Sequence, residues 1–245
     1  EKIRFFVNVA HDIRTPVSLI KGPLNDLEES EALTEKGKTS LNIAVKNTEK
    51  LFQMVSQLLD FEKADLSALR LIVSPNELAE YIQEKISFFN VEAKHKQIYL
   101  TYDIGFDSLN VWFDREKMDK IVNNIFSNAI KYTKEGGQVH IKVCQDDKNW
   151  SLIVSDTGIG IPASEQKHLF KSFFRAKNAI NSRETGSGIG LLLTKKLVKL
   201  HKGEISFSSK EGIGTEFKLT FPKGDSYFMH GNKPTEYQGS DYPKV

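Results

Sequence analysis

A histidine followed directly by an acid stands early in the chain, in the string His-Asp-Ile-Arg-Thr-Pro over residues 11–16. A neutral imidazole beside a carboxylate can accept a phosphoryl group, because the carboxylate orients the ring and takes its proton. Thr15 lies one helical turn beyond His11 on the same face of a helix. A solitary surface histidine more often has no function, but the complete string inside a helical repeat favours a phosphoacceptor.

A second group of polar residues is spaced by four and three along a predicted helix over residues 114–132, namely Asn124, Asn128 and Lys131. Amide oxygens one turn apart suit a hard cation such as Mg2+, which needs only one or two protein ligands, and a lysine suits phosphate. The alternative is a polar helix face of chance composition. Asn is a poor helix former, so its repeated use here favours function modestly.

Two sets of glycines follow. Asp156 ends an apolar strand and precedes Gly158 and Gly160, so a carboxylate stands beside backbone that can approach a ligand closely. Such a carboxylate can accept a hydrogen bond from an exocyclic amine, as in adenine. The second set stands before a helix that begins near Leu191, where N–H groups and the helix dipole attract phosphate. Its members are Gly186, Gly188 and Gly190. The second set has neither Walker nor Rossmann spacing, and the first glycine pair alone is compatible with a tight turn.

Between the glycine sets, residues 163–185 carry several phenylalanines and Arg175. Residues 177–185 are polar and aperiodic, which is typical of a mobile lid over a cleft. The guanidinium of Arg175 suits the terminal phosphate of a nucleotide, and a surface salt bridge is the alternative.

The elements that must position these residues follow from periodicity. Apolar residues recur every three or four positions over 3–27 and again over 41–59, with a polar turn over 28–38 that ends at Gly37. Two antiparallel helices result, and because a lone hairpin cannot bury both apolar faces, we expect a homodimer through residues 1–66 that forms a four-helix bundle.

Beyond residue 69 the period changes. We expect a short strand over residues 70–73, and a capping box at Ser74-Pro75-Asn76-Glu77 that opens a helix ending near Ala93. Further helices are predicted over 114–132 and 187–201. Strands are predicted over residues 97–104, 111–113, 138–144, 150–154, 204–208 and 215–221. The fold class is therefore an α+β sandwich, a sheet covered on one face by helices, after an all-α hairpin.

Composition excludes several classes. Lys and Arg number 34 against 32 acids among 245 residues, and this near-balance argues against direct nucleic-acid binding. The single cysteine, Cys144, excludes an intramolecular disulfide and fits a reducing compartment. No apolar run approaches about 20 residues, so we expect no membrane contact within this piece and a cytoplasmic location. The helical register already present at Glu1 indicates a fragment whose first helix continues upstream.

The string at residues 11–16 resembles the phosphoacceptor box of sensor histidine kinases. Four motifs follow in order: an asparagine box at 124–132, a first glycine box at 156–160, a phenylalanine box within 163–185 and a second glycine box at 186–190. Their order resembles the Bergerat-type ATP-binding domain of the same family. The resemblance covers about residues 3–221. It implies a dimerisation and histidine phosphotransfer hairpin at 1–66, a catalytic ATP-binding domain at 67–224, and a linker or tail at 225–245.

The resemblance also implies roles for single residues. His11 would be phosphorylated, Asp12 would act as the base, and Thr15 would position water for a phosphatase reaction on the partner regulator. The implied ATP and Mg2+ site consists of the metal ligand Asn124, then Asn128, Lys131, Tyr132, Asp156, Gly158, Gly160, Arg175, Gly186, Gly188, Gly190 and Leu191.

The function implied is ATP-dependent autophosphorylation on His11, then transfer to an aspartate on the receiver domain of a response regulator, in the cytosolic part of a membrane-anchored sensor. Two other classes stay open. One is a scaffold, a degenerate kinase that binds nucleotide or regulator without transferring phosphate. The other is an ATP hydrolase with a conformational role.

Overall fold

The chain divides into two compact units, residues 1–69 with 162–196 and residues 70–161 with 197–245. The computed structural model describes residues 33–45, 71–171, 174–181 and 188–224 together with Ile20, Leu24, Leu27, Thr48 and Leu51.

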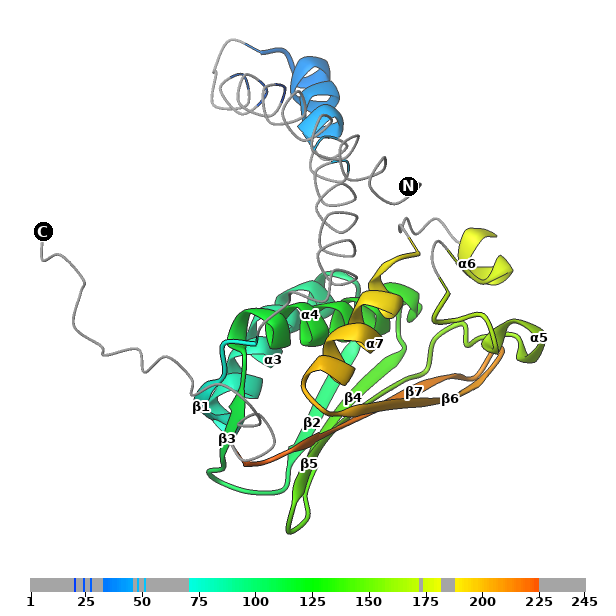
Figure 1. Ribbon diagram of the computed structural model, residues 1–245. Helices are drawn as coiled ribbons and strands as arrows, with labels where there is room; N and C mark the ends of the chain where they lie inside the picture. The colour runs from blue at the N-terminus through cyan, green and yellow to red at the C-terminus, as the bar shows by residue number, and fades with distance from the viewer. Residues whose placement is uncertain are drawn as a thin grey trace, which may run out of the picture. The chain divides into compact units, whose positions relative to one another are not determined.

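The second unit is built on a five-stranded sheet of order β2-β4-β5-β7-β6 (Figure 1). β2 is parallel to β4, and the other neighbouring strands are antiparallel. Its strands are β2 (Tyr99–Ile104), β4 (Gln138–Gln145), β5 (Asn149–Asp156), β6 (Glu204–Lys210) and β7 (Gly214–Pro222). A separate antiparallel pair joins β1 (Ser74–Glu77) to β3 (Asn110–Phe113).

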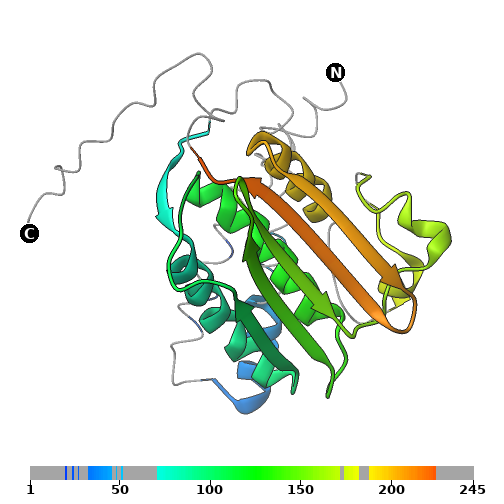
Figure 2. The ribbon, with the colours of Figure 1, turned by 90° about the horizontal axis from the view of Figure 1, so that it is seen from below.

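Helices α3 (Leu78–His95) and α4 (Arg115–Tyr132) cover one face of the five-stranded sheet, and Figure 2 shows them behind the strands. The strands alternate accordingly. In β4 the buried side chains are those of Val139, Ile141 and Val143, with more exposed residues between them. The residues of α4 that fill the core beneath them are Met118, Ile121, Val122, Ile125, Phe126, Ala129 and Ile130. The predicted α+β fold, with helices on one face of a sheet, is confirmed.

Helix α4 has the predicted bounds because Asp114 caps it. The Oδ1 atom of Asp114 accepts a hydrogen bond from the backbone N–H of Lys117 at 3.1 Å, which satisfies one of the free donors of the first turn. The helix then ends at Tyr132, with Asn124, Asn128 and Lys131 on it as expected.

The prediction was wrong for residues 71–77, while Arg70 lies outside the described residues. Leu71–Val73 are irregular, and the predicted capping box is instead strand β1, whose Ser74 pairs with Phe113. The helix begins three residues later than predicted, at Leu78, and Glu77 is its cap, because the Glu77 carboxylate accepts from the N–H groups of Ala79 and Glu80. Strand pairing overrides the local capping signal here, and an edge strand tolerates Pro75.

Two smaller expectations also need correction. Gly37 does not end a turn but lies in helical residues 35–45, whose first turn is capped by the Thr34 hydroxyl at 3.2 Å from the Gly37 nitrogen. The helix predicted from residue 187 begins at Gly190, as α7 (Gly190–Leu200).

The first unit contains, besides residues 35–45, the short helices α5 (Ala163–Gln166) and α6 (Lys177–Asn181) and the first turns of α7. The predicted helical hairpin and its dimer interface lie largely outside the described residues, as do His11, Asp12, Thr15, Gly186 and the tail over 225–245. None of the helices that the structure describes is both long enough and apolar enough to cross a membrane.

Candidate functional site

The carboxylate of Asp156 lies at the end of β5, partly buried. Its Oδ1 accepts hydrogen bonds from the backbone N–H groups of Gly158 at 2.8 Å and Thr215 at 3.3 Å. Within the described residues of the chain both of its hydrogen bonds go to Oδ1, and Oδ2 is the second acceptor atom of this partly buried carboxylate. A hydrogen-bond donor such as an exocyclic amine suits that position.

Burial raises the pKa of Asp156 to about 6, although the two backbone hydrogen bonds favour the ionised form. The carboxylate is therefore mostly ionised at pH 7, at a cost in desolvation. A buried acid with a raised pKa at a strand end is more typical of a binding site than of a core.

The first glycine loop packs against the end of α4. The N–H of Ile159 donates to the carbonyl of Tyr132 at 3.1 Å, and a β-carbon on Gly158 would come within 2.5 Å of that same oxygen. Gly160 has a φ of +61°, and a β-carbon there would come within 2.1 Å of the carbonyl of Lys210. Both predicted glycines are thus required by close backbone approach.

The polar face of α4 leads to this loop. Asn124 and Asn128 are both partly exposed, with the Asn128 Nδ2 atom 3.5 Å from the Asn124 Oδ1 atom. Lys131 follows one turn later, and its ammonium lies 5.0 Å from the centre of the Tyr132 ring. The structure therefore places the end of α4, at Tyr132, against the Gly158–Ile159 loop, and a shared ligand for the α4 residues and Asp156 stays a prediction.

The amide side chains on α4 fit a magnesium ion that is held mainly by the phosphates of a nucleotide and by water. The amide oxygen of Asn124, a partly exposed residue, is a ligand type that suits Mg2+, which keeps several waters. Over the described ranges no group of three or more His, Cys, Asp or Glu side chains could form a metal cage.

The remaining predicted residues belong to the first unit. Gly188 has a φ of +73° and Gly190 opens α7, followed by the partly buried Leu191. The first turn of a helix leaves N–H groups for an anion. The Arg175 guanidinium donates to the carbonyl of Ala179 at 2.8 Å, inside the same segment. Its predicted reach to a phosphate therefore stays a prediction.

Sequence reasoning missed Thr215 and Ser209. Thr215 donates to Asp156, and the Ser209 hydroxyl lies 2.9 Å from the Thr215 hydroxyl and accepts from the N–H of Ile161 at 2.9 Å. The available signal was Gly214, which precedes Thr215. It has a φ of +146°, and a β-carbon there would lie 1.8 Å from the Asp156 carbonyl.

Two family models match the chain. Residues 1–67 match the His Kinase A (phospho-acceptor) domain, and residues 113–225 match the histidine kinase-, DNA gyrase B-, and HSP90-like ATPase. The chain belongs to the histidine kinase family.

Similar curated proteins are also histidine kinases. The chain is 30% identical over 243 residues to histidine kinase P4 of Formosa agariphila, covering 98% of this chain and 18% of that protein. It is 32% identical over 229 residues to the sensor protein GacS of Pseudomonas syringae pv. syringae, covering 91% of this chain and 25% of that protein. This histidine kinase sequence thus spans a quarter or less of the length of these two relatives.

Solved structures share the fold, among them that of the histidine kinase ThkA. Full-length ShkA in complex with AMPPNP superposes with a TM-score of 0.76 at 21% identity, over 90% of this chain and 46% of that one. ThkA in complex with the response regulator protein TrrA superposes with a TM-score of 0.63 at 24% identity, over 90% of this chain and 61% of that one.

Proposed function

We propose that the chain is an ATP-dependent protein-histidine kinase that phosphorylates its own His11 and passes the phosphoryl group to an aspartate on a response regulator. Residues 1–66 would form the dimeric phosphoacceptor hairpin, residues 67–224 the catalytic domain, and residues 225–245 a linker or tail. The observation that carries the proposal is the partly buried Asp156 carboxylate at the end of β5, whose Oδ1 is held by the backbone N–H groups of Gly158 and Thr215.

ATP would bind with its adenine amine donating to Asp156 and its ring lying near Tyr132. Asn128 and Lys131 would contact the phosphates, and the N–H groups of the second glycine set would cradle them. Mg2+, when bound through Asn124 and water, screens phosphate charge. Arg175 would exchange its hydrogen bond to the carbonyl of Ala179 for one to the terminal phosphate and so place a further positive charge there.

In the transfer step, the His11 imidazole nitrogen forms a bond to the γ-phosphorus as the bond from that phosphorus to ADP breaks. Asp12 takes the proton from the other ring nitrogen. The resulting phosphoramidate is reactive enough to phosphorylate a carboxylate. The regulator as partner is supported by ThkA, which was solved with the response regulator protein TrrA. We also propose that Thr15 positions water for dephosphorylation of the regulator.

The location we propose is the cytoplasm, as the kinase region of a longer sensor, since the relatives include sensor proteins several times the length of this chain.

The experiment is incubation of the chain with Mg2+ and γ-labelled ATP, with protein-bound label and free phosphate measured together. The kinase predicts protein-bound label that is lost in acid and retained in alkali. Free phosphate without bound label would favour an ATP hydrolase, and bound ATP without either product would favour a scaffold.

A further inference from the structure

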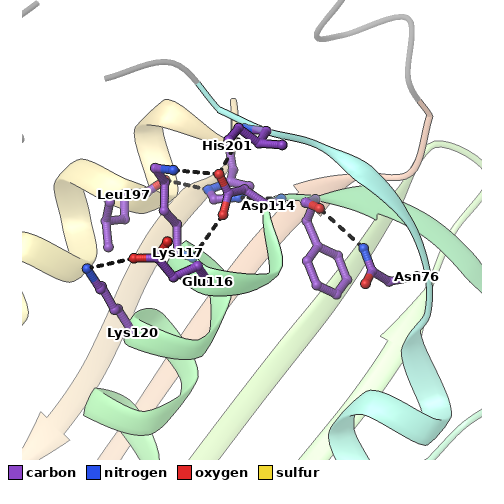
Figure 3. Close-up of polar contacts among 9 residues, drawn as sticks. Asn76, Asp114, Glu116, Lys117, Lys120, Leu197 and His201 are labelled. Atoms are coloured by element: carbon purple, nitrogen blue, oxygen red, sulfur yellow. Dashed lines mark hydrogen bonds and ion pairs between the residues drawn. The ribbon is translucent and has the colours of Figure 1, made fainter. Parts of the chain in front are cut away.

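Three segments of the second unit meet at Asp114, a residue that is 3% exposed (Figure 3). Its Oδ1 atom caps α4, as described above. Its Oδ2 atom accepts a hydrogen bond from the backbone N–H of Ile72 at 2.9 Å and pairs with the Lys117 ammonium at 2.5 Å. One carboxylate thus binds both the start of α4 and the segment that enters the domain from the phosphoacceptor side.

The backbone of Asp114 makes a third connection. Its N–H donates to the Nε2 atom of His201 at 3.3 Å, while the His201 Nδ1 atom lies 2.9 Å from the carbonyl of Leu197 (Figure 3). A carbonyl only accepts and an amide N–H only donates, so the buried imidazole is neutral with its proton on Nδ1. Asp114 therefore also holds the end of α7.

The entering segment is fixed from Ile72 onward. β1 pairs along its length with β3, and the Asn76 amide donates to the carbonyl of Phe113 at 3.2 Å. Glu77 caps α3 and accepts from the N–H of Leu109 at 2.8 Å. Ile72 itself is 75% exposed, so its side chain contributes little packing. The contact of its backbone N–H with Asp114 begins the fixed segment at Ile72, ahead of the first paired residue of β1, Ser74.

We propose that Asp114 is a positioning residue for the kinase reaction, which fixes the entering segment at Ile72 onto helix α4 and so sets the orientation in which the ATP-binding domain meets His11. This inference rests on the proposed function. The buried pair of Asp114 and Lys117 then holds the entering segment in addition to capping α4.

The physical reason is geometric. Phosphoryl transfer needs the reacting atoms about 3–3.5 Å apart and in line, and a misplacement of about 1 Å can cost a hundredfold in rate. Release of Ile72 and Val73 would add up to about 7 Å of loose chain, at roughly 3.3 Å for each residue. α4 is rigid, and Asn124 lies ten residues after Asp114, about 15 Å along the axis. Loose chain at the cap therefore alters where the domain stands and leaves its nucleotide residues in place.

The test removes the donor in one variant and an acceptor oxygen in another, since proline also fixes the φ angle of residue 72. Ile72→Pro deletes the N–H that Asp114 accepts but leaves the α4 cap and the Lys117 pair, and Ile72→Ala is the matched control that keeps the N–H. Asp114→Asn is a second variant, because Asn still caps a helix but loses one acceptor oxygen. For each full chain, the dissociation constant of ATP and the initial rate of autophosphorylation at saturating Mg2+ and ATP are measured.

We expect Ile72→Pro and Asp114→Asn to bind ATP within twofold of the unsubstituted chain but to label at least threefold more slowly, while Ile72→Ala matches the unsubstituted chain in both. Equal labelling rates for Ile72→Pro and Ile72→Ala would overturn the proposal. A parallel loss of ATP affinity would also overturn it, because the contact would then support the nucleotide site itself.

A readout without kinase activity separates this proposal from the proposed function. Amide hydrogen exchange at Ile72 should be slow in the unsubstituted chain and at least tenfold faster in Asp114→Asn. If the unsubstituted chain acquires no label, the kinase assignment fails. Fast exchange at Ile72 in the unsubstituted chain would refute the anchor whatever the activity.

Discussion

The carbonyl oxygen of Tyr132 lies so close to Gly158 that a β-carbon on that glycine would come within 2.5 Å of it. The same oxygen accepts a hydrogen bond from Ile159. The last turn of α4 is therefore in direct backbone contact with the loop after β5. This contact fixes the position of the helix end relative to the loop that follows Asp156.

Gly158→Ala should disrupt this backbone contact. The added methyl group would meet backbone that cannot rotate away, and overpacking of this kind costs roughly 1–3 kcal/mol. We expect the midpoint of thermal unfolding to fall and the ATP dissociation constant to rise at least tenfold, measured by calorimetric titration. Gly105→Ala is the control, because its nearest contact would be an ordinary 3.4 Å to the Val143 carbonyl. Unchanged ATP affinity in Gly158→Ala would contradict the proposed pocket.

Binding of the adenine ring should depend on the ionisation of Asp156. Burial raises the pKa of Asp156 to about 6, so the carboxylate takes up a proton as the pH falls below that value and loses acceptor strength. Adenosine, which lacks phosphates, should bind more weakly below pH 6, by up to ~10-fold for each further pH unit. Asp156→Asn should bind at least about tenfold more weakly at pH 7, because a hydrogen bond to a charged group contributes roughly 1.5–3 kcal/mol. A flat profile from pH 5 to 8 in the unsubstituted protein would exclude this role.

The same carboxylate should affect stability in the opposite sense. Its pKa is raised in the folded chain, so its contribution to the free energy of unfolding is fully present below the ordinary value of 3.8 and is lost as the pH rises through about 6. Asp156→Asn removes this dependence. In urea unfolding without nucleotide, the free energy of unfolding of the variant relative to that of the unsubstituted protein should rise between pH 4 and 7. The expected rise is on the order of 2–3 kcal/mol, since each pKa unit corresponds to about 1.4 kcal/mol. A variant that is less stable at pH 7 would argue that Asp156 is structural.

Asn124→Ala should weaken the magnesium-dependent component of ATP binding. With Mg2+ present we expect the dissociation constant of ATP to rise about tenfold. With a chelator present we expect it to stay within twofold, because the Asn124 amide oxygen would bind the metal and its water rather than the nucleotide. Asn123→Ala is the matched control, since Asn123 is the exposed neighbour on the same helix. Equal losses with and without Mg2+ would place Asn124 elsewhere in the site.

Much of the second unit follows from sequence. The helix from Asp114 to Tyr132 has an N-cap, a clear apolar stripe and a defined end, and all three appear in the structure. Strand β4 alternates between buried and more exposed residues because one face of the sheet packs against the helices. Residues 74–77 were mispredicted because their pairing partner, β3, is more than 30 residues away, and a local capping pattern carries no information about it.

The site divides in the same way. Asp156, Gly158 and Gly160 could be found from residue type and order, because close backbone approach demands glycine. Thr215 could not, since its contribution is a backbone N–H brought to Asp156 across β5 and β7. The contact of Arg175 with Ala179 is likewise a tertiary detail that spacing does not encode.

The central claim is that His11 accepts the phosphoryl group. The most direct measurement is mass spectrometric mapping of the chain after incubation with Mg2+ and ATP at alkaline pH, beside His11→Gln. We predict one phosphorylated residue, His11, and no phosphorylation in His11→Gln, which should bind ATP as tightly as the unsubstituted chain. Phosphate on another residue, or persistent phosphorylation in His11→Gln, would contradict the account.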